Sequence, residues 1–279
     1  MSEHVLLSWS EGVATVTLNR PEKLNAFAGD MRERLAESLD AVAERGDARV
    51  LVLTGAGRGF CAGGDVRHMA DLRGRQAGFE ALRPLLAAGG AIVARIAALP
   101  MPTIAAVNGV AAGAGLHLAL ACDLRIASDQ ASFAATFARV GLHPDWGGTY
   151  LLPRRVGLAR ALEMCWLGDA VDAAAALRIG LVERVVPHAA FAAEVAGLAR
   201  RLAAAPQTSV RLAKRTLAAS LERILAECLA AEEAAQAACW ASRDPDEGLA
   251  AFVAKRAPVF TAPALDPDAP PSAASRHFE

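Results

Sequence analysis

Two glycine-rich segments, each following a short run of strand-forming residues, constrain most strongly what this chain can fold into. The first spans residues 58–65 after the apolar run 50–53, and the second spans residues 108–115 after the run 103–107. Small residues let a ligand approach the backbone closely. Because each segment opens toward a predicted helix, the two could aim two N–H groups at one oxygen, which is the layout of an oxyanion hole. The pair therefore suggests a reaction that passes through an anionic oxygen intermediate.

The order of the predicted elements indicates an α/β fold. We expect strands at residues 5–7, 13–18, 49–54, 102–107, 123–127 and 132–133, and helices after Asp30, between 68 and 99, and at 116–121. Asp30 is a candidate N-cap for the first of these helices. Strands and helices that alternate in this way build an α/β core.

The pattern becomes helical almost throughout after residue 186, which predicts a change of architecture there. We predict a core domain over residues 1–200 and a C-terminal helical region over 201–262. Residues 263–279 contain four prolines and are predicted to be a disordered tail.

Composition and charge exclude several classes of function. The chain has 279 residues, 54% of them hydrophobic, and a net charge of −1, so no strong field favours nucleic acid or an anionic membrane. We see no secretory signal and no apolar stretch of about 20 residues that would span a bilayer. Five cysteines without a pairing pattern indicate free thiols and predict a cytoplasmic protein. No histidine or cysteine set has the spacing of a metal site.

Residues 57–62 formally match the glycine pattern of a dinucleotide-binding turn. That pattern should open a helix directly and be followed about 20 residues later by an acid that ends a second strand. Here Gly63-Gly64-Asp65 prolongs the turn and a helical region follows, so the match is weak. A purely structural turn would explain either glycine segment alone, but it explains the pair less well.

Four phrases of the chain resemble the enoyl-CoA hydratase/isomerase (crotonase) superfamily, and they occur in that family's order. They are RPEKLNAF, LTGAGRGFCAGGD, AAVNGVAAGAGLHLALACDLRIAS and GLHPDWGGTYLLPRRVG. Within the family, the chain looks most similar to epoxyphenylacetyl-CoA isomerases and related 3,2-enoyl-CoA isomerases. The resemblance implies a spiral of ββα units with a C-terminal helical trimerisation region, assembled as a homotrimer or a dimer of trimers. It also implies an acyl-CoA thioester substrate and no cofactor beyond the CoA moiety.

The resemblance assigns the thioester carbonyl to two backbone N–H donors, Gly64 and Ala114. Many relatives have glycine where this chain has Ala114, but a backbone donor survives that change if φ stays negative. Hydratases of the family use two glutamates, which align with His117 and Phe137 here. Because Phe137 cannot transfer a proton, the two-glutamate hydration mechanism is unsupported.

Asp145 stands at the position of the catalytic acid of the isomerase subgroup. One carboxylate suffices for a 1,3-proton shift, and apolar neighbours would raise its pKa. The plainer interpretation of Asp145 is an N-cap of the helix that follows. His117 is either a second acid or base or a satisfied core histidine, and for Cys61 we favour close packing over nucleophilic chemistry.

Substrate contacts are carried over from the resemblance more loosely, and a solvated surface charge is the alternative for the two lysines. The candidates for binding the CoA or acyl moiety are Arg20, Lys23, Leu24, Ala62, Asp65, Phe137, Trp146, Lys255 and Phe260.

We therefore expect an acyl-CoA enzyme that isomerises a double bond, with Asp145 as proton shuttle. The alternatives are an enoyl-CoA hydratase that works with Asp145, aided by His117, and a non-catalytic acyl-CoA-binding protein.

Overall fold

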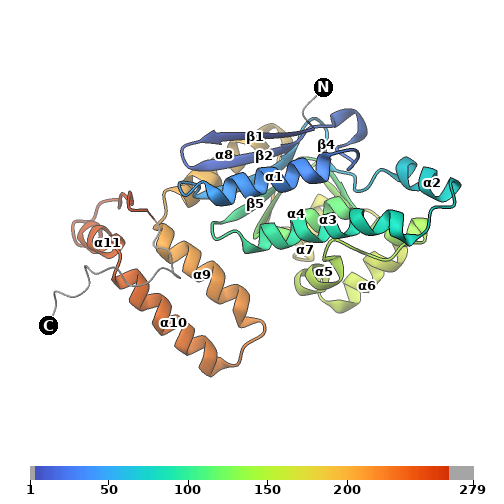
Figure 1. Cartoon of the computed structure of the whole chain (residues 1–279). Helices are drawn as coiled ribbons and strands as arrows, with labels where there is room; N and C mark the ends of the chain where they lie inside the picture. Colours follow the sequence, from blue (N-terminus) through green and yellow to red (C-terminus); the bar gives the residue numbers. More distant parts are fainter. Residues whose placement is uncertain (1–3, 264–279) are drawn as a thin grey trace. The chain divides into compact units, whose positions relative to one another are not determined.

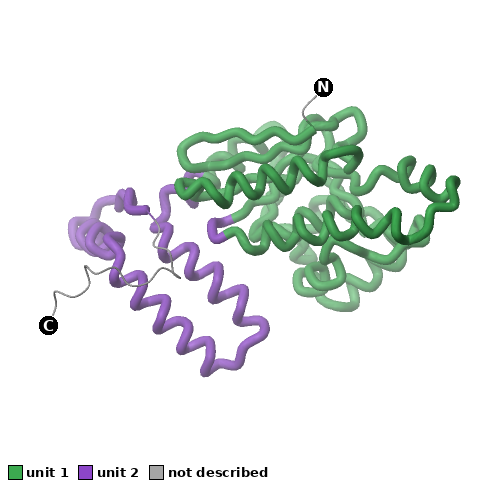
Figure 2. Tube along the Cα trace, viewed as in Figure 1, with its two compact units in different colours: residues 1–99, 103–199 green, residues 100–102, 200–279 purple. Residues whose placement is uncertain are grey.

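The computed structural model describes residues 4–263, which form two compact units. Unit 1 comprises the chain up to residue 99 together with residues 103–199, and unit 2 comprises residues 100–102 and the chain from residue 200 on (Figure 2). The sequence placed the boundary between core and helical region after residue 200. The predicted disordered tail lies outside the described residues, apart from Pro263.

Unit 1 contains a six-stranded and a four-stranded sheet (Figure 1). The larger sheet has the order β1-β2-β3-β5-β7-β10, and all its neighbouring pairs are parallel except the β1–β2 hairpin. Its strands are β1 (Val5–Ser10), β2 (Val13–Leu18), β3 (Val50–Gly55), β5 (Thr103–Val107), β7 (Leu124–Ser128) and β10 (Arg184–Val186). The smaller sheet has the order β4-β6-β8-β9, where β4 to β8 are parallel and β9 is antiparallel. Its strands are β4 (Gly59–Cys61), β6 (Val110–Ala112), β8 (Ser132–Ala134) and β9 (Val171–Asp172).

From β3 to β8, consecutive strands alternate between the two sheets, and this alternation produces the spiral. The pairs β3/β4, β5/β6 and β7/β8 each place their first strand in the larger sheet and their second in the smaller one. A helical segment follows each pair before the chain enters the next one. The expected crotonase-type ββα spiral is therefore the observed fold. Strands β3 and β5 read as continuous apolar runs because parallel strands are covered on both faces.

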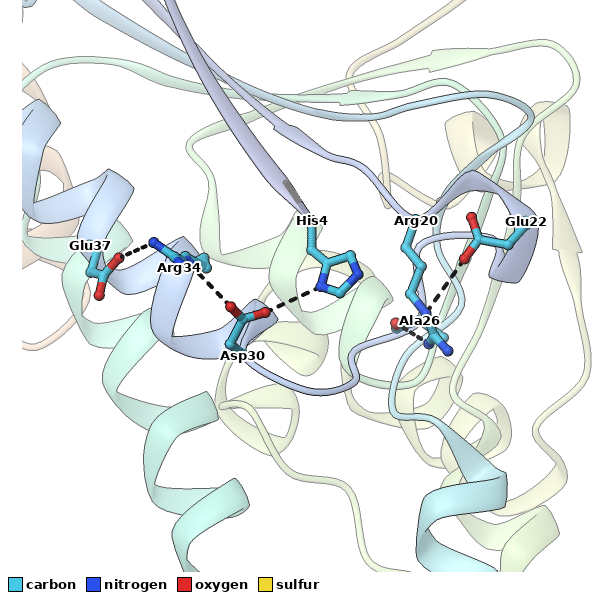
Figure 3. Close-up of polar contacts among 7 residues, drawn as sticks. All are labelled: His4, Arg20, Glu22, Ala26, Asp30, Arg34 and Glu37. Atoms are coloured by element: carbon cyan, nitrogen blue, oxygen red, sulfur yellow. Dashed lines mark hydrogen bonds and ion pairs between the residues drawn. The ribbon is translucent and has the colours of Figure 1, made fainter. Parts of the chain in front are cut away.

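The helices of unit 1 surround these sheets. They are α1 (Met31–Glu44), α2 (Val66–Gly74), α3 (Phe79–Ala98), α4 (Ala114–Ala121), α5 (Gly148–Val156), α6 (Leu158–Leu167), α7 (Ala173–Arg178) and most of α8 (Phe191–Ala203), with 3-10 turns η1 (Pro21–Lys23), η2 (Thr136–Val140) and η3 (His188–Ala190). Helix α1 buries the apolar stripe that its spacing predicts, and it lies beside α3 (Figure 1). Asp30 is the N-cap residue of α1, as expected, but its side chain makes no capping hydrogen bond. Its carboxylate instead contacts His4 and Arg34, both at 3.2 Å (Figure 3).

Helix α3 is long and apolar enough, by length and composition alone, to cross a membrane, with a mean hydropathy of 1.4 over the best window. This differs from the expectation that no stretch of the chain reaches that length. Such a helix is weak support for a membrane span by itself. In this structure α3 packs along α1, and Arg95 of α3 pairs with Asp40 of α1 at 2.8 Å.

Unit 2 is built from helices α9 (Gln207–Ser220), α10 (Leu225–Trp240) and α11 (Asp244–Val253), each packed on the next. The ammonium of Lys214 donates to the carbonyl of Met101 at 3.0 Å, which ties the short 100–102 segment to α9. After α11, the guanidinium of Arg256 pairs with Glu247, and the N–H of Val259 donates to the same carboxylate at 2.7 Å. These contacts hold the end of the described chain against α11.

Candidate active site

The candidate site lies at one edge of the smaller sheet, where three chain segments leave parallel strands. Because β4, β6 and β8 run in the same direction, their carboxyl ends meet at this edge. Residues 63–65 follow β4, residues 113–114 follow β6, and residues 136–137 follow β8. Each glycine-rich segment therefore contains a short strand that the sequence did not reveal, followed by the turn that reaches the site.

The two glycine turns touch each other main chain to main chain. Gly63 has φ of +94°, and a Cβ there would lie 2.7 Å from the carbonyl oxygen of Ala112 and 3.3 Å from the nitrogen of Ala114. A Cβ on Gly115 would lie 2.0 Å from the carbonyl oxygen of Cys61. Side chains at these glycines would force the turns apart, so the absence of Cβ atoms is what brings the two backbones together.

Both proposed donors keep a free N–H. The Phe27 N–H donates to Gly63 at 2.7 Å and the Asp65 N–H donates to Phe27 at 3.1 Å, so this bridge fixes the turn without using the N–H of Gly64. Ala114 is the first residue of α4, where helix N–H groups have no partner within the helix. Neither N–H has a hydrogen-bond acceptor among residues 4–263.

Gly64 and Ala114 line one cavity of about 360 Å³. Its wall is mostly apolar, with Asp145 and Arg32 among its few charged groups. An adjoining cavity of about 580 Å³ runs between α2, α3 and the end of η2. The two share the side chains of Val66, Met69, Phe79, Leu82, Val140 and Leu142. The arrangement suits an apolar chain that leads away from the two N–H groups.

Asp145 presents an unpaired carboxyl oxygen to this site. Gly147, with φ of +70°, is the N-cap of α5, and no side chain caps that helix. The interpretation of Asp145 as an N-cap is therefore wrong. Its Oδ1 is buried without a hydrogen-bond partner. Burial raises the pKa of Asp145 to about 6, although the charge of Arg32 acts to lower it.

His117 supports Asp145 from behind the cavity wall. Its ring is fully buried in α4 and does not line the cavity. Its Nδ1 lies 2.7 Å from the backbone carbonyl of Asp145, which can only accept, so Nδ1 carries the proton. Burial lowers the pKa of His117 to about 4, which leaves the ring neutral at physiological pH.

Two aromatic residues complete the wall around the carboxyl group. Phe137 is largely buried, lines the cavity and stacks on His117 with ring centroids 5.2 Å apart. Trp146 is buried, and its ring centroid lies 4.6 Å from that of Phe27. Its indole also covers Gly89 of α3. Both line the cavity, and their contact with an acyl group remains a prediction.

The early candidates for CoA binding divide into lining and supporting residues. Ala62 and Asp65 line the cavity, whereas Arg20, Lys23 and Leu24 do not. Arg20 donates to the Asp65 carboxylate at 3.0 Å and to the carbonyl of Ala26 at 3.1 Å (Figure 3 shows the latter contact). Leu24 accepts from the Ala62 N–H at 2.9 Å, and Lys23 is exposed on η1. Arg20 and Leu24 therefore position the first glycine turn.

The two late candidates belong to unit 2. Lys255 is exposed just after α11, and a Cβ on Gly248 would lie 3.7 Å from the ring of Phe260. Phe260 also lines a cavity of about 240 Å³ within unit 2. Their contact with CoA remains a prediction.

Arg32 is a cavity-lining residue that sequence reasoning missed. It occupies the second position of α1 and is 9% exposed. Within the amphipathic pattern of α1 it reads as one more surface charge, and no local signal distinguishes it from Glu33 or Arg34. Cys61, in contrast, behaves as expected for a packed thiol, because burial raises its pKa to about 12. Within residues 4–263 no cluster of three or more potential metal ligands occurs.

Comparison with known proteins agrees with this architecture. A model of the enoyl-CoA hydratase/isomerase family matches residues 8–263. The 1,2-epoxyphenylacetyl-CoA isomerase of Escherichia coli K12 is 42% identical over 266 residues, covering 94% of this chain and 99% of the relative. The crotonyl-CoA hydratase of Syntrophomonas wolfei is 34% identical over 259 residues, covering 92% of this chain and 98% of the relative. The crystal structure of an enoyl-CoA hydratase from Bacillus anthracis superposes with a TM-score of 0.87 at 33% identity, covering 92% of this chain and 99% of that one.

The fold, the paired glycine turns and these similarities define an acyl-CoA enzyme of the crotonase fold. The chain belongs to the enoyl-CoA hydratase/isomerase family.

Proposed function

We propose that this enzyme moves a double bond within an unsaturated acyl-CoA, with Asp145 as the only proton shuttle. The observation that carries the proposal is the unpaired, buried carboxyl oxygen of Asp145, a residue that lines the same cavity as Gly64 and Ala114. The one other carboxylate on the cavity wall, Asp65, is bound by Arg20 and by the Arg67 N–H. Asp145 is therefore the carboxylate available for proton transfer.

The chemistry follows from this arrangement. Ionised Asp145 removes a proton from the carbon next to the thioester, and the negative charge moves onto the thioester oxygen. The two N–H groups stabilise that charge more than they stabilise the starting carbonyl. Protonated Asp145 then returns the proton at the far end of the conjugated system. A pKa near 6 suits both steps, because neither protonation state is strongly favoured near neutral pH.

The positions of His117 and Phe137 argue against hydration. A hydratase needs groups that hold and activate a water beside the double bond. Phe137 offers no polar atom, and the one proton on the neutral His117 ring is directed to the Asp145 backbone. We therefore assign His117 a positioning role.

The test compares double-bond migration with water addition. The purified enzyme would be incubated with 3-enoyl-CoA and with 2-enoyl-CoA, and both reactions followed separately. We expect migration to dominate in the wild type. In Asp145→Asn, migration should fall by about 100- to 10,000-fold, the range for loss of a general acid–base. Glu44→Gln, which neutralises an exposed carboxylate at the end of α1, is the matched control and should keep full activity.

Two outcomes would overturn this assignment. Faster hydration of 2-enoyl-CoA than migration would favour the hydratase alternative. CoA-ester binding without turnover of any unsaturated thioester would favour a binding protein.

We further propose that the reaction needs no group beyond the CoA moiety of its substrate and takes place in the cytoplasm.

A further inference from the structure

Among residues 4–263, no counter-ion contacts the buried charge of Arg32. The residue is 9% exposed, while Glu33, Arg34 and Glu37 on the same helix are exposed. Its Nε is buried without a partner, and within residues 4–263 its guanidinium makes no hydrogen bond or ion pair. The guanidinium carbon lies 5.3 Å from the ring centre of Phe27. Burying an unpaired ion is costly in general, so an acceptor supplied by a ligand would offset part of that cost.

The guanidinium faces the reacting end of the cavity. A Cβ on Gly64 would lie 4.0 Å from Nη2 of Arg32, so the cation borders the first oxyanion donor. Arg32 and Asp145 line the same cavity and sense each other's charge. The two residues form no hydrogen bond or ion pair with each other, and both Nε of Arg32 and Oδ1 of Asp145 are buried without a partner among the described residues. Each side therefore presents an unsatisfied polar atom, one a donor and one a carboxyl oxygen.

A purely hydrocarbon acyl chain would interact productively with Asp145 but not with Arg32. It can give a proton to Asp145, but it offers nothing to the five N–H donors of an arginine. It would also displace whatever water solvates the guanidinium. A hydrogen-bond acceptor on the acyl group would replace that water and would meet an always-charged donor in an apolar setting.

We propose that Arg32 binds an oxygen of the acyl group, so that the preferred substrates are acyl-CoA thioesters with a hydrogen-bond-accepting oxygen on the acyl chain. This inference rests on the acyl-CoA site proposed above and names its substrate class. The oxygen belongs either to a second carboxylate or to a neutral carbonyl group. In both cases Arg32 is a substrate-binding residue, and Asp145 remains the group that moves the proton.

The test measures binding of saturated thioesters, which cannot isomerise, so it does not depend on turnover. Dissociation constants of hexanoyl-CoA, 5-oxohexanoyl-CoA and adipoyl-CoA would be measured by calorimetry for the wild type, Arg32→Met and Arg34→Met. We expect at least one oxygenated thioester to bind about 10- to 100-fold more tightly than hexanoyl-CoA, as a charged hydrogen bond allows. That preference should vanish in Arg32→Met and persist in Arg34→Met, which removes an exposed arginine of the same helix.

The relative affinities of the three thioesters distinguish a carboxylate from a neutral oxygen, and they also show whether the inference is wrong. A preference for adipoyl-CoA identifies a carboxylate, and a preference for 5-oxohexanoyl-CoA identifies a neutral oxygen. Equal binding of all three thioesters overturns the inference while leaving the isomerase proposal intact. An equal loss for all three in Arg32→Met also overturns it, because Arg32 would then contact the thioester oxygen that they share. Binding of none would overturn the acyl-CoA site itself.

A second variant guards against a folding artefact. Arg32→Lys keeps the charge but loses the planar fork of donors, so it should retain part of the preference. Because Arg32→Met removes an unpaired buried charge, we expect its unfolding midpoint without ligand to equal or exceed that of the wild type. A well-folded Arg32→Lys without any preference for oxygenated thioesters, together with an Arg32→Met that retains it, would contradict the assignment.

Discussion

At the scale of single residues, the pKa of the Asp145 carboxyl group is set by opposing electrostatic effects. Burial favours its neutral form, while the charge of Arg32 and, more weakly, His143 favour the ionised form. The main chain of the same residue is fixed separately, by His117 and by the Gly148 N–H at 3.0 Å. The carboxyl group can therefore change its protonation state while its backbone stays in place, as a group that gives and takes one proton must do.

This balance predicts the pH dependence of the reaction. Only ionised Asp145 can accept a proton, and its pKa is raised to about 6. For an isomerisable thioester, kcat/KM should therefore fall about tenfold per pH unit below 6 and level off above it, because this ratio reports the free enzyme. Arg32→Met removes an influence that lowers this pKa, so the acidic limb should move to higher pH. A profile measured from pH 4.5 to 8 that is flat, or that breaks near pH 4, would contradict the assignment of Asp145 as the base.

Residue patterns predicted the two glycine turns better than the side chains around them. The glycine spacing suggested that two turns meet, and the resemblance to the family assigned the donors to Gly64 and Ala114 within those turns. Arg32 could not be found in this way. Its burial results from the packing of α1 beside two segments, those of Phe27 and Gly64, which are joined by a β-bridge. The direction of His117 is likewise set by Asp145, which is 28 residues away along the chain.

At the scale of elements, long periodic segments were predicted well and very short ones were missed. Helix α1 and strands β3 and β5 lie close to their expected residues, because each carries its own apolar pattern. Strands β4, β6 and β9 have only two or three residues each and exist through pairing with distant partners. The smaller sheet, which holds the site, was therefore the part of the fold least visible in the sequence.

Helix α3 lines the cavity and also packs closely on Trp146 at Gly89, a contact that a pair of alanine substitutions can test. A Cβ on Gly89 would lie 2.2 Å from Nε1 of Trp146, whereas a Cβ on Gly90 would meet nothing within 4 Å. Gly89→Ala should displace the indole, lower stability by about 1–3 kcal/mol and reduce kcat/KM by about 10- to 100-fold through Asp145. Gly90→Ala should leave activity unchanged and raise stability by up to about 1 kcal/mol.

Denaturant unfolding and steady-state kinetics of both variants check this prediction. Equal effects of the two substitutions would show that the loss comes from helix α3 in general and not from Trp146. Full activity in a destabilised Gly89→Ala would separate the packing of Trp146 from the placement of the carboxylate.

At the scale of the whole molecule, unit 2 leaves large apolar side chains exposed. Phe252 is 83% exposed and Leu225 is 74% exposed. Others of the same kind on unit 2 are Leu217, Leu221, Ile224, Leu229, Trp240, Leu249, Val253 and Val259. Extended apolar surface of this kind marks a protein interface. We propose that unit 2 forms the contact of a homotrimer or a dimer of trimers.

Light scattering after size-exclusion chromatography tests this assembly. We expect a particle of three or six times the chain mass of 29.0 kDa. Leu225→Arg, which places a charge in the exposed apolar set, should shift the particle toward the monomer while circular dichroism stays helical. A wild-type monomer at micromolar concentration would contradict the proposal.

The contact between the two glycine turns has a consequence for how such an enzyme can change its chemistry. The groups that we propose to hold the anionic oxygen are peptide N–H groups, and no substitution at residues 64 or 114 other than proline deletes them. The side chains that we propose to decide the fate of the intermediate are Arg32, Phe137 and Asp145, which lie on separate segments around the same cavity. On this proposal, substitution of one of these side chains changes the reaction, while the backbone N–H groups still stabilise the same anionic intermediate.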